Sequence, residues 1–287
     1  MPWRVSRRNC PGSESNPVAP KRRFQRTRES LAGPIARMPP DSPPSLPVPR
    51  IALFDLLRGT ALAAMAVYHF SWDLEFFGLA ELEITQNLLW IAFAREIAAS
   101  FLALVGVSLV LAHGGRIRWR GFLRRLAVVA AAAAAITILS SFADPDGIIW
   151  FGILHCIAVS SLLGLIFLRA PLWLTTAVAA ACLAAPSLLA SPAFNAPGWL
   201  WLGLASDPIP SNDYNPLLPW FGCVLLGIVM ARLVLPHAQG APWAEWQPHS
   251  PVARALALAG RHSLLFYLLH QPILMGAVWL ALQLTPG

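Results

Sequence analysis

Apolar residues from position 51 onward gather in long runs that short polar segments separate. Seven runs have the length of a membrane-spanning helix: residues 51–71, 88–112, 121–142, 148–168, 171–190, 217–235 and 262–282. About twenty residues at 1.5 Å per residue cross the roughly 30 Å hydrocarbon core of a bilayer. Aliphatic, alanine-rich runs are helical in lipid, because only closed backbone hydrogen bonding is stable there. The pattern predicts an all-α fold, a polytopic transmembrane helical bundle with about seven spans.

The composition agrees with a membrane protein and argues against a soluble enzyme. Hydrophobic residues make up 56% of the chain and charged residues only 12%, roughly half the charged fraction of soluble domains. Residues 1–50 hold 10 of the 21 Lys and Arg and 3 of the 14 acids, so the whole net charge of +7 belongs to this end. The remainder is balanced and has no basic surface for nucleic acid.

Residues 1–49 differ from the rest of the chain. They hold 11 of the 26 prolines, a basic run at 21–23 and hardly any apolar clustering, so they cannot bury enough surface to fold alone. We expect a disordered, basic, proline-rich cytoplasmic tail, followed by a transmembrane domain over residues 50–287. Met38 stands just before the last proline-rich stretch, which suggests that residues 1–37 are an artefact of an upstream start assignment.

The connections between the predicted spans differ sharply in charge. One set of helix ends, on the side of the basic tail, is flanked by arginines, and the other set has acids but no Lys or Arg. The arginines are Arg116, Arg118, Arg120, Arg124, Arg125, Arg169, Arg232, Arg254 and Arg261. Because basic connections stay in the cytoplasm, we expect a cytoplasmic N-terminus and an extracytoplasmic C-terminus. The longest outer connection, 191–216, is expected to form a structured lid or mouth.

Ionisable side chains within the first span are the strongest candidates for chemistry, since an unpaired charge in a bilayer is costly. At 100° per residue, one helix face carries Asp55, Arg58, His69 and Asp73. His69 lies about 16 Å beyond Arg58, so the stripe suits a reaction across the membrane. Two structural alternatives stay open: a snorkelling pair of Asp55 with Arg58, and a core imidazole at His69. In the functional interpretation, Asp73 orients the His69 ring and raises its basicity.

Polar side chains in other spans lie at a similar depth. Arg95 and Glu96 in the second span are either site residues or part of an interhelical salt bridge. His155 in the fourth span is either a site residue or a structural histidine. The last span carries a polar seam of Ser263, Tyr267, His270 and Gln271. This seam is either a cofactor-facing wall or a structural hydrogen-bond seam.

The sequence lacks the motifs of several other kinds of site. It has no GxGxxG, no P-loop, no HExxH and no carboxylate pair suggestive of glycoside cleavage. Its four cysteines include no CxxC, and three of them lie inside apolar runs. We therefore expect buried core cysteines and no metal site.

Several segments resemble a known family. They are RIALFDLLRG at 50–59, YHFSWD at 68–73, FLALVGVS at 101–108, GILH at 152–155, LPWFG at 218–222 and GRHSLLFYLLHQP at 260–272. The first two resemble the first-helix signature of the bacterial DUF1624 family, which is related to the catalytic domain of heparan-α-glucosaminide N-acetyltransferase and to the wider transmembrane acyltransferases. The similarity covers about residues 50–282.

The resemblance implies an integral acyltransferase of the bacterial cytoplasmic (inner) membrane. Such an enzyme moves an acyl group from cytoplasmic acyl-CoA, most often acetyl-CoA, to a hydroxyl or amine of an extracytoplasmic glycan or lipid-linked acceptor. His69 falls at the histidine that these enzymes use, and Asp73 matches the aspartate after it. An unperturbed imidazole suits proton removal near neutral pH. A covalent acyl-histidine relay is the alternative to direct transfer.

The other candidate residues would assist this transfer. Arg95 or a protonated His155 could stabilise the oxyanion. Tyr267 and His270 would face the co-substrate. The acyl-CoA phosphates could be held by Arg58, Arg116, Arg118, Arg124 and Arg125. Ordinary positive-inside charge is the alternative explanation for the loop arginines.

The competing function is a small proton-coupled transporter or flippase, whose path would use His69, Arg95, Glu96 and His155. The spans show no evident inverted repeat and no matching pair of broken helices, which speaks against it. A non-catalytic membrane scaffold would leave the intramembrane charges without a purpose. The sequence leaves the acceptor, the acyl chain and the oligomeric state open.

Overall fold

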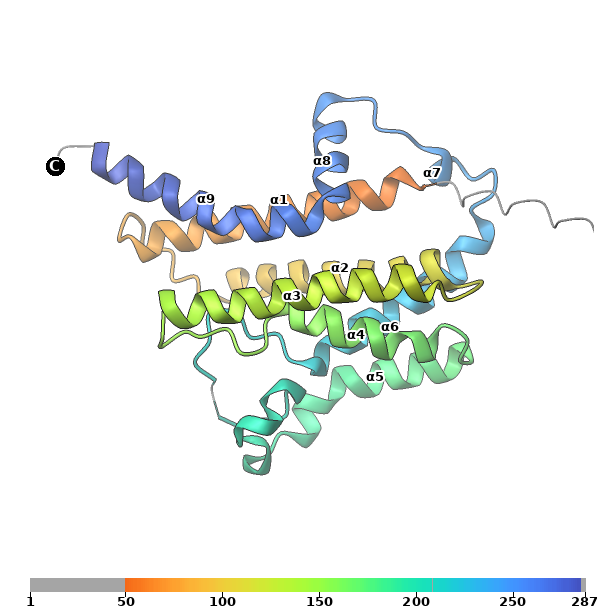
Figure 1. The fold of residues 1–287 in the computed structure, drawn as a ribbon, viewed down its shortest axis with the longest axis horizontal. Helices are drawn as coiled ribbons and strands as arrows, with labels where there is room; N and C mark the ends of the chain where they lie inside the picture. Colours follow the sequence, from red (N-terminus) through yellow and green to blue (C-terminus); the bar gives the residue numbers. More distant parts are fainter. Residues whose placement is uncertain (1–49, 208, 285–287) are drawn as a thin grey trace, which may run out of the picture. The chain divides into compact units, whose positions relative to one another are not determined.

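Seven long helices follow one another in the computed structural model, which describes residues 50–207 and 209–284. They are α1 (Ala52–Phe76), α2 (Leu88–His113), α3 (Trp119–Ala143), α4 (Ile153–Phe167), α5 (Leu172–Leu189), α6 (Leu217–Val234) and α9 (Ser263–Leu284) (Figure 1). Each corresponds to one of the seven apolar runs. Because the described residues form no strand, the predicted all-α class is confirmed. The predicted tail at 1–49 lies outside the described residues.

Most of the long helices can cross a membrane. Five of them, α2, α3, α5, α6 and α9, have both the length and the apolar composition for it. The helix α4 is apolar but has 15 residues, and α1 is long enough but carries Asp55, Arg58, Asp73 and Glu75. These two bring the number close to the seven spans expected from the sequence. The helices fit a multi-pass membrane protein.

Shorter helices lie in the connections. They are η1 (Pro192–Phe194), η2 (Pro197–Leu202), η3 (Leu235–His237), α7 (Pro242–Glu245) and α8 (Pro251–Arg261). The apolar-run analysis missed α8, because its apolar residues occupy one face only and its mean hydropathy is low. The start of α8 is encoded locally, since Ser250 Oγ accepts a 3.1 Å hydrogen bond from the Ala253 N–H and Pro251 takes the first helical position.

The start of α4 is set by contacts with α3. The apolar run begins at 148, but the helix begins at Ile153. Thr137 Oγ1 donates to the Ile149 carbonyl (2.7 Å), and the Ile149 N–H donates to Ser140 Oγ (3.0 Å). These bonds satisfy the backbone of the segment before α4 without helical pairing. His155 consequently lies in the first turn of α4.

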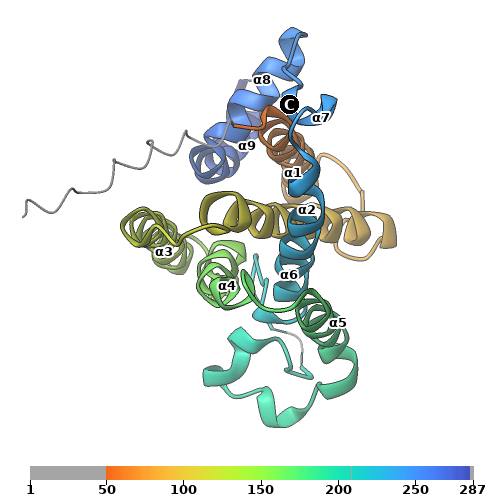
Figure 2. The same cartoon turned by 90° about the vertical axis from the view of Figure 1, so that its right-hand side faces the viewer.

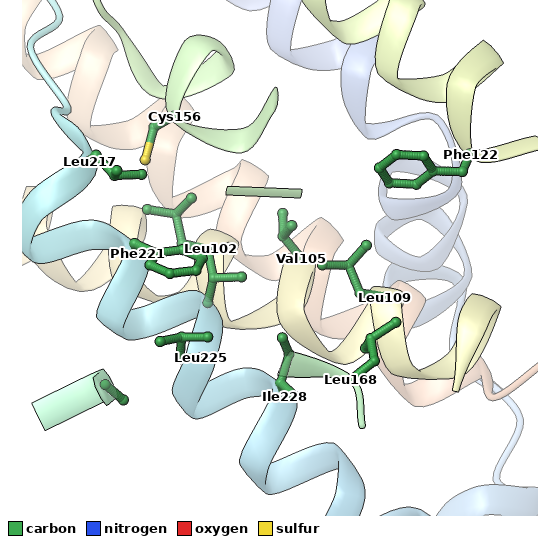
Figure 3. Close-up of a cluster of buried hydrophobic side chains, with 12 residues drawn as sticks. Leu102, Val105, Leu109, Phe122, Cys156, Leu168, Leu217, Phe221, Leu225 and Ile228 are labelled. Atoms are coloured by element: carbon green, nitrogen blue, oxygen red, sulfur yellow. The ribbon is translucent and has the colours of Figure 1, made fainter. Parts of the chain in front are cut away.

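The larger core joins α2, α4, α5 and α6. Leu102, Leu225 and Ile228 are fully buried in it (Figure 3). Val224 is fully buried in the same core. Glycine lets the α2 and α6 backbones touch, since a Cβ at Gly227 would overlap the Ala103 carbonyl. The α2–α6 pair therefore forms a rigid centre beside which α1 packs.

The helices α1, α8 and α9 form a second packing unit on the other side of α2 (Figure 2). A smaller buried cluster of Leu62, Met65 and Ile97 joins α1 to α2. The helix α8 crosses the first turns of α1 (Figure 1), where a Cβ at Gly59 would overlap the Leu256 carbonyl. The helix α9 packs along α1 and is otherwise largely exposed, as suits an apolar helix in lipid.

Candidate active site

The polar side chains of α9 meet those of α1 at the end of α1 that the charge pattern places outside. The His69 and His270 rings lie edge to face, with 4.9 Å between their centroids. One helical turn further along α1, Gln271 Nε2 donates a 2.6 Å hydrogen bond to Asp73 Oδ1. We call His69, Asp73, His270 and Gln271 the α1–α9 polar cluster. It joins the stripe predicted on the first span to the seam predicted on the last.

Three buried polar atoms of this cluster have no hydrogen-bond partner among the described residues: Asp73 Oδ2, His270 Nε2 and Gln271 Oε1. The Asp73 side chain is fully buried, and none of the described basic side chains forms an ion pair with it. An unsatisfied buried polar group costs about 1–3 kcal/mol, and more when it is charged. Three such atoms on neighbouring side chains make this cluster a candidate site for a bound polar molecule or for ordered water.

The backbone fixes the tautomer of His270. Its Nδ1 lies 2.6 Å from the Tyr267 carbonyl oxygen of the preceding turn. A carbonyl oxygen can only accept a hydrogen bond, so Nδ1 carries the proton. In the neutral ring, Nε2 then keeps its lone pair and is one of the unpartnered buried atoms. His270 therefore presents a free basic nitrogen beside His69.

Apolar packing holds both helices of the cluster in place. Tyr68, next to His69 on α1, and Tyr267 on α9 pack against the buried Leu62, Met65 and Ile97. Because these contacts involve α1, α2 and α9 together, they limit the rotation of α1 and α9 about their axes. An apolar groove of about 200 Å³ runs along α9 beside Ala66 and has His270 in its wall.

Tyr267 ties α9 to the connection before α6. Its hydroxyl donates a 3.3 Å hydrogen bond to Asp213 Oδ2, which also accepts from the Ile153 N–H at 3.0 Å. Asn215 donates to the other carboxylate oxygen. Burial raises the pKa of the Asp213 carboxyl, and these donors oppose that rise. Asp213 thus links the start of α4 to the helix that carries His270.

Neither His155 nor Arg95 makes a hydrogen bond, ion pair or ring contact with the α1–α9 polar cluster among the described residues. The Gly152 N–H donates to His155 Nδ1 (3.3 Å), so Nε2 carries the proton and donates to Thr137 Oγ1 (3.3 Å). Both ring nitrogens of His155 are thereby used in fixing the start of α4. Arg95 and Glu96 are exposed on α2, and neither forms an ion pair within the described residues.

The predicted phosphate-binding arginines do not form one group. Arg58 donates to Asp55 Oδ1 (3.0 Å) and to Ser108 Oγ (2.6 Å), and Arg125 on α3 is close enough to act on it electrostatically. The side chains of Arg116, Arg118 and Arg124 are exposed, and no hydrogen bond of theirs is found among the described residues. Arg58 is thus the member of that set whose side chain has hydrogen-bond partners among the described residues.

Sequence reasoning had placed Gln271 in the polar seam but had given it no role at the site. The sequence feature that could have identified Gln271 as a site residue is a glutamine inside an apolar helix, directly after a histidine. Asp213 lies in the connection 191–216, for which the sequence predicts only a structured lid or mouth. Its position at Ile153 and Tyr267 depends on the folded path of residues 209–216, which the sequence pattern does not give.

Residues 50–272, more than three quarters of the chain, match the family described as "Heparan-alpha-glucosaminide N-acetyltransferase, catalytic". The chain belongs to this family. No curated protein and no solved structure matches it significantly.

Membership in the heparan-alpha-glucosaminide N-acetyltransferase catalytic family confirms the resemblance found in the sequence. It places the chain in a family of membrane N-acetyltransferases. The matched region contains the whole α1–α9 polar cluster and ends at Pro272, directly after Gln271. The unpartnered atoms of the cluster therefore lie inside the part of the chain that carries the family likeness.

Proposed function

We propose that this protein is an integral-membrane acetyltransferase of the bacterial cytoplasmic membrane. It takes an acetyl group from cytoplasmic acetyl-CoA and transfers it to a hydroxyl or amine of an extracytoplasmic glycan or lipid-linked acceptor. The N-terminus is cytoplasmic and the C-terminus extracytoplasmic. The reaction takes place at the α1–α9 polar cluster, with His69 as the base or as the group that relays the acetyl.

The observation that supports this proposal best is the meeting of His69 with three buried, unpartnered polar atoms from Asp73, His270 and Gln271. In a purely structural seam, neighbouring side chains or backbone N–H groups would donate hydrogen bonds to these atoms. Instead the cluster offers two oxygens that accept hydrogen bonds and a nitrogen with a free lone pair. An acceptor that carries several N–H or O–H groups would satisfy all three.

The transfer follows from ordinary acyl chemistry. His69 removes the proton from the acceptor N–H or O–H, and the acceptor atom attacks the thioester carbonyl. The new C–N or C–O bond forms, the C–S bond breaks, and the CoA thiolate leaves and takes up a proton. In the relay version the imidazole first receives the acetyl group from the thioester and then passes it to the acceptor. Asp73 Oδ2 and Gln271 Oε1 hold other donor groups of the acceptor during the step.

The His270 ring has a defined part in this proposal. Its Nδ1 proton is held by the Tyr267 carbonyl, so its Nε2 can accept a hydrogen bond from the acceptor or take up a proton. Protonation of both adjacent imidazoles at once is unfavourable, because like charges at this distance repel each other strongly in a low dielectric. The two rings therefore carry at most one positive charge between them at any time.

Acetyl transfer by inverted membrane vesicles tests the proposal. Vesicles with the full chain receive acetyl-CoA labelled in the acetyl group, and the label is followed into lipids and glycans. We expect incorporation with the wild type and with His249→Ala, a control that removes an imidazole from an exposed connection. His69→Ala should abolish it. Incorporation at the level of vesicles without the protein would contradict the proposed function.

A further inference from the structure

A cluster of arginines surrounds one buried carboxylate at the opposite, cytoplasmic end of α1. The Asp55 side chain is only 3% exposed and contacts three guanidinium groups. Arg50 Nε lies 2.8 Å, Arg58 Nη1 3.0 Å and Arg261 Nε 3.4 Å from its oxygens. One carboxylate neutralises one guanidinium. The group of Asp55, Arg50, Arg58 and Arg261, which we call the Asp55 cluster, thus carries two positive charges in excess.

The excess charge faces outward. Arg50 is 64% and Arg261 43% exposed, while Asp55 lies behind them. Each guanidinium has five N–H donors. Arg50 uses two of its nitrogens on Asp55, and Arg261 contacts Asp55 through Nε. The remaining donors of these two side chains have no acceptor among the described residues. Planar, outward-facing guanidinium donors of this kind suit phosphate oxygens.

The cluster is built from distant parts of the chain that are locked together. Arg58 lies on α1 and Arg50 lies just before its first residue, whereas Arg261 is the last residue of α8. A Cβ at Gly260 would overlap the Asp55 carbonyl, so the two helices meet at their backbones at this point. The positive-inside rule explains arginines at this end of α1. It does not require a buried acid, nor arginines from two separate segments that meet at that acid. Arg254, on the same helix α8, is exposed and remains outside the cluster.

We propose that the Asp55 cluster binds a phosphate group presented from the cytoplasmic side. Two sources share this chemistry: the phosphates of the CoA donor and the headgroup of an anionic phospholipid. With CoA as the source, the inference rests on the proposed function. Arg58 and His69 are separated by about 16 Å along α1, which is comparable to the length of the extended pantetheine arm between the CoA diphosphate and its sulfur. A donor held at the Asp55 cluster would then bring its thioester to His69.

Binding measurements on the full chain in nanodiscs test this site. The affinity for CoA and for pantetheine, which lacks phosphate, is measured in zwitterionic phosphatidylcholine. We expect Arg50→Gln and Arg261→Gln each to weaken CoA binding about tenfold, which is the loss of about one charge-assisted contact. Pantetheine binding should not change. Arg254→Gln, the matched control, should stay within about twofold of the wild type. Both tested arginines are exposed at the surface of the protein, so the variants are expected to fold.

A second arm identifies the source of the phosphate. The thermal stability of each variant is compared in discs with and without phosphatidylglycerol. If this lipid stabilises the wild type and the Arg254→Gln control but not Arg50→Gln or Arg261→Gln, the phosphate site is supported with a lipid headgroup as its ligand. That outcome holds even if CoA does not bind, a result that would contradict the proposed function.

The remaining outcomes overturn the inference. If CoA binds the wild type, Arg50→Gln and Arg261→Gln equally and phosphatidylglycerol acts on all variants alike, the Asp55 cluster is not a phosphate site, while the proposed function stands. If neither CoA nor phosphatidylglycerol binds the wild type, both proposals are wrong.

Discussion

The hydrogen bond from Gln271 to Asp73 fixes the geometry of the α1–α9 polar cluster, and Gln271→Met tests its strength. Methionine keeps the length of the side chain but removes the donor. A hydrogen bond to a charged group is worth about 1.5–3 kcal/mol in soluble proteins, whereas interhelical bonds in membranes average about 0.6 kcal/mol. Gln271 Oε1 is buried and has no hydrogen-bond partner among the described residues. Removing this atom therefore offsets part of the free energy of unfolding that is lost with the hydrogen bond. We expect a net destabilisation of about 1 kcal/mol.

A double-mutant cycle separates this bond from other effects of the substitution. Unfolding free energies of the wild type, Gln271→Met, Asp73→Leu and the double variant are measured by denaturant titration in mixed micelles, since leucine is similar in shape to aspartate but cannot accept the hydrogen bond. If the bond joins the two side chains, their coupling energy should be about 1 kcal/mol. Gln283→Met, at an exposed position near the end of the same helix, is the control and should leave stability unchanged. Additive effects, with a coupling below about 0.3 kcal/mol, would refute the pairing.

Three further predictions concern the fold, the topology and the tail. Gly227→Leu should lower stability by about 3 kcal/mol or more, because the side chain would separate α2 from α6. Gly276→Leu is the control, since Gly276 has open space around it. Equal melting temperatures of the two variants would contradict the packing of α2 on α6. Cysteines are introduced at Asp144 or at Gln239 in a variant without the native cysteines. The cysteine at Asp144 should react with an impermeant thiol reagent from outside, and the one at Gln239 only after permeabilisation. The reverse pattern would overturn the predicted orientation. Deletion of residues 1–37 should leave insertion and acetyl transfer intact, and a large loss of either would assign the tail to the working protein.

The sequence predicted the long helices because their signal is local. An uninterrupted apolar run of about twenty residues has one stable form in a bilayer, so each run became a helix. The 100° periodicity also placed His69 and Asp73 on one face of α1, and the structure keeps them on the side that α9 covers. Family membership was equally accessible, because the motifs that carry it are contiguous segments.

Contacts between helices could not be predicted in the same way. The periodicity of α1 cannot tell which helix its polar face will meet, so the pairing of Asp73 with Gln271 could not be predicted. The expected hydrogen bond between the His69 ring and Asp73 is not found among the described residues. The same limit applies to Arg261, which was counted only as cytoplasmic charge. Its approach to Asp55 depends on α8, a helix whose one-sided apolar pattern falls below the signal of a membrane span.

The participation of His69 in catalysis is the central claim, and turnover per folded molecule tests it most directly. His69→Ala and His69→Gln are purified, their folded fractions are measured, and acetyl transfer is determined at saturating acetyl-CoA. The glutamine variant keeps a polar side chain that can bond within the core, so it separates a structural role from a chemical one. We expect both variants to lose about two orders of magnitude or more in specific turnover, with CoA affinity within a few fold of the wild type and His249→Ala fully active. Specific turnover of either His69 variant within about threefold of the wild type would contradict the claim.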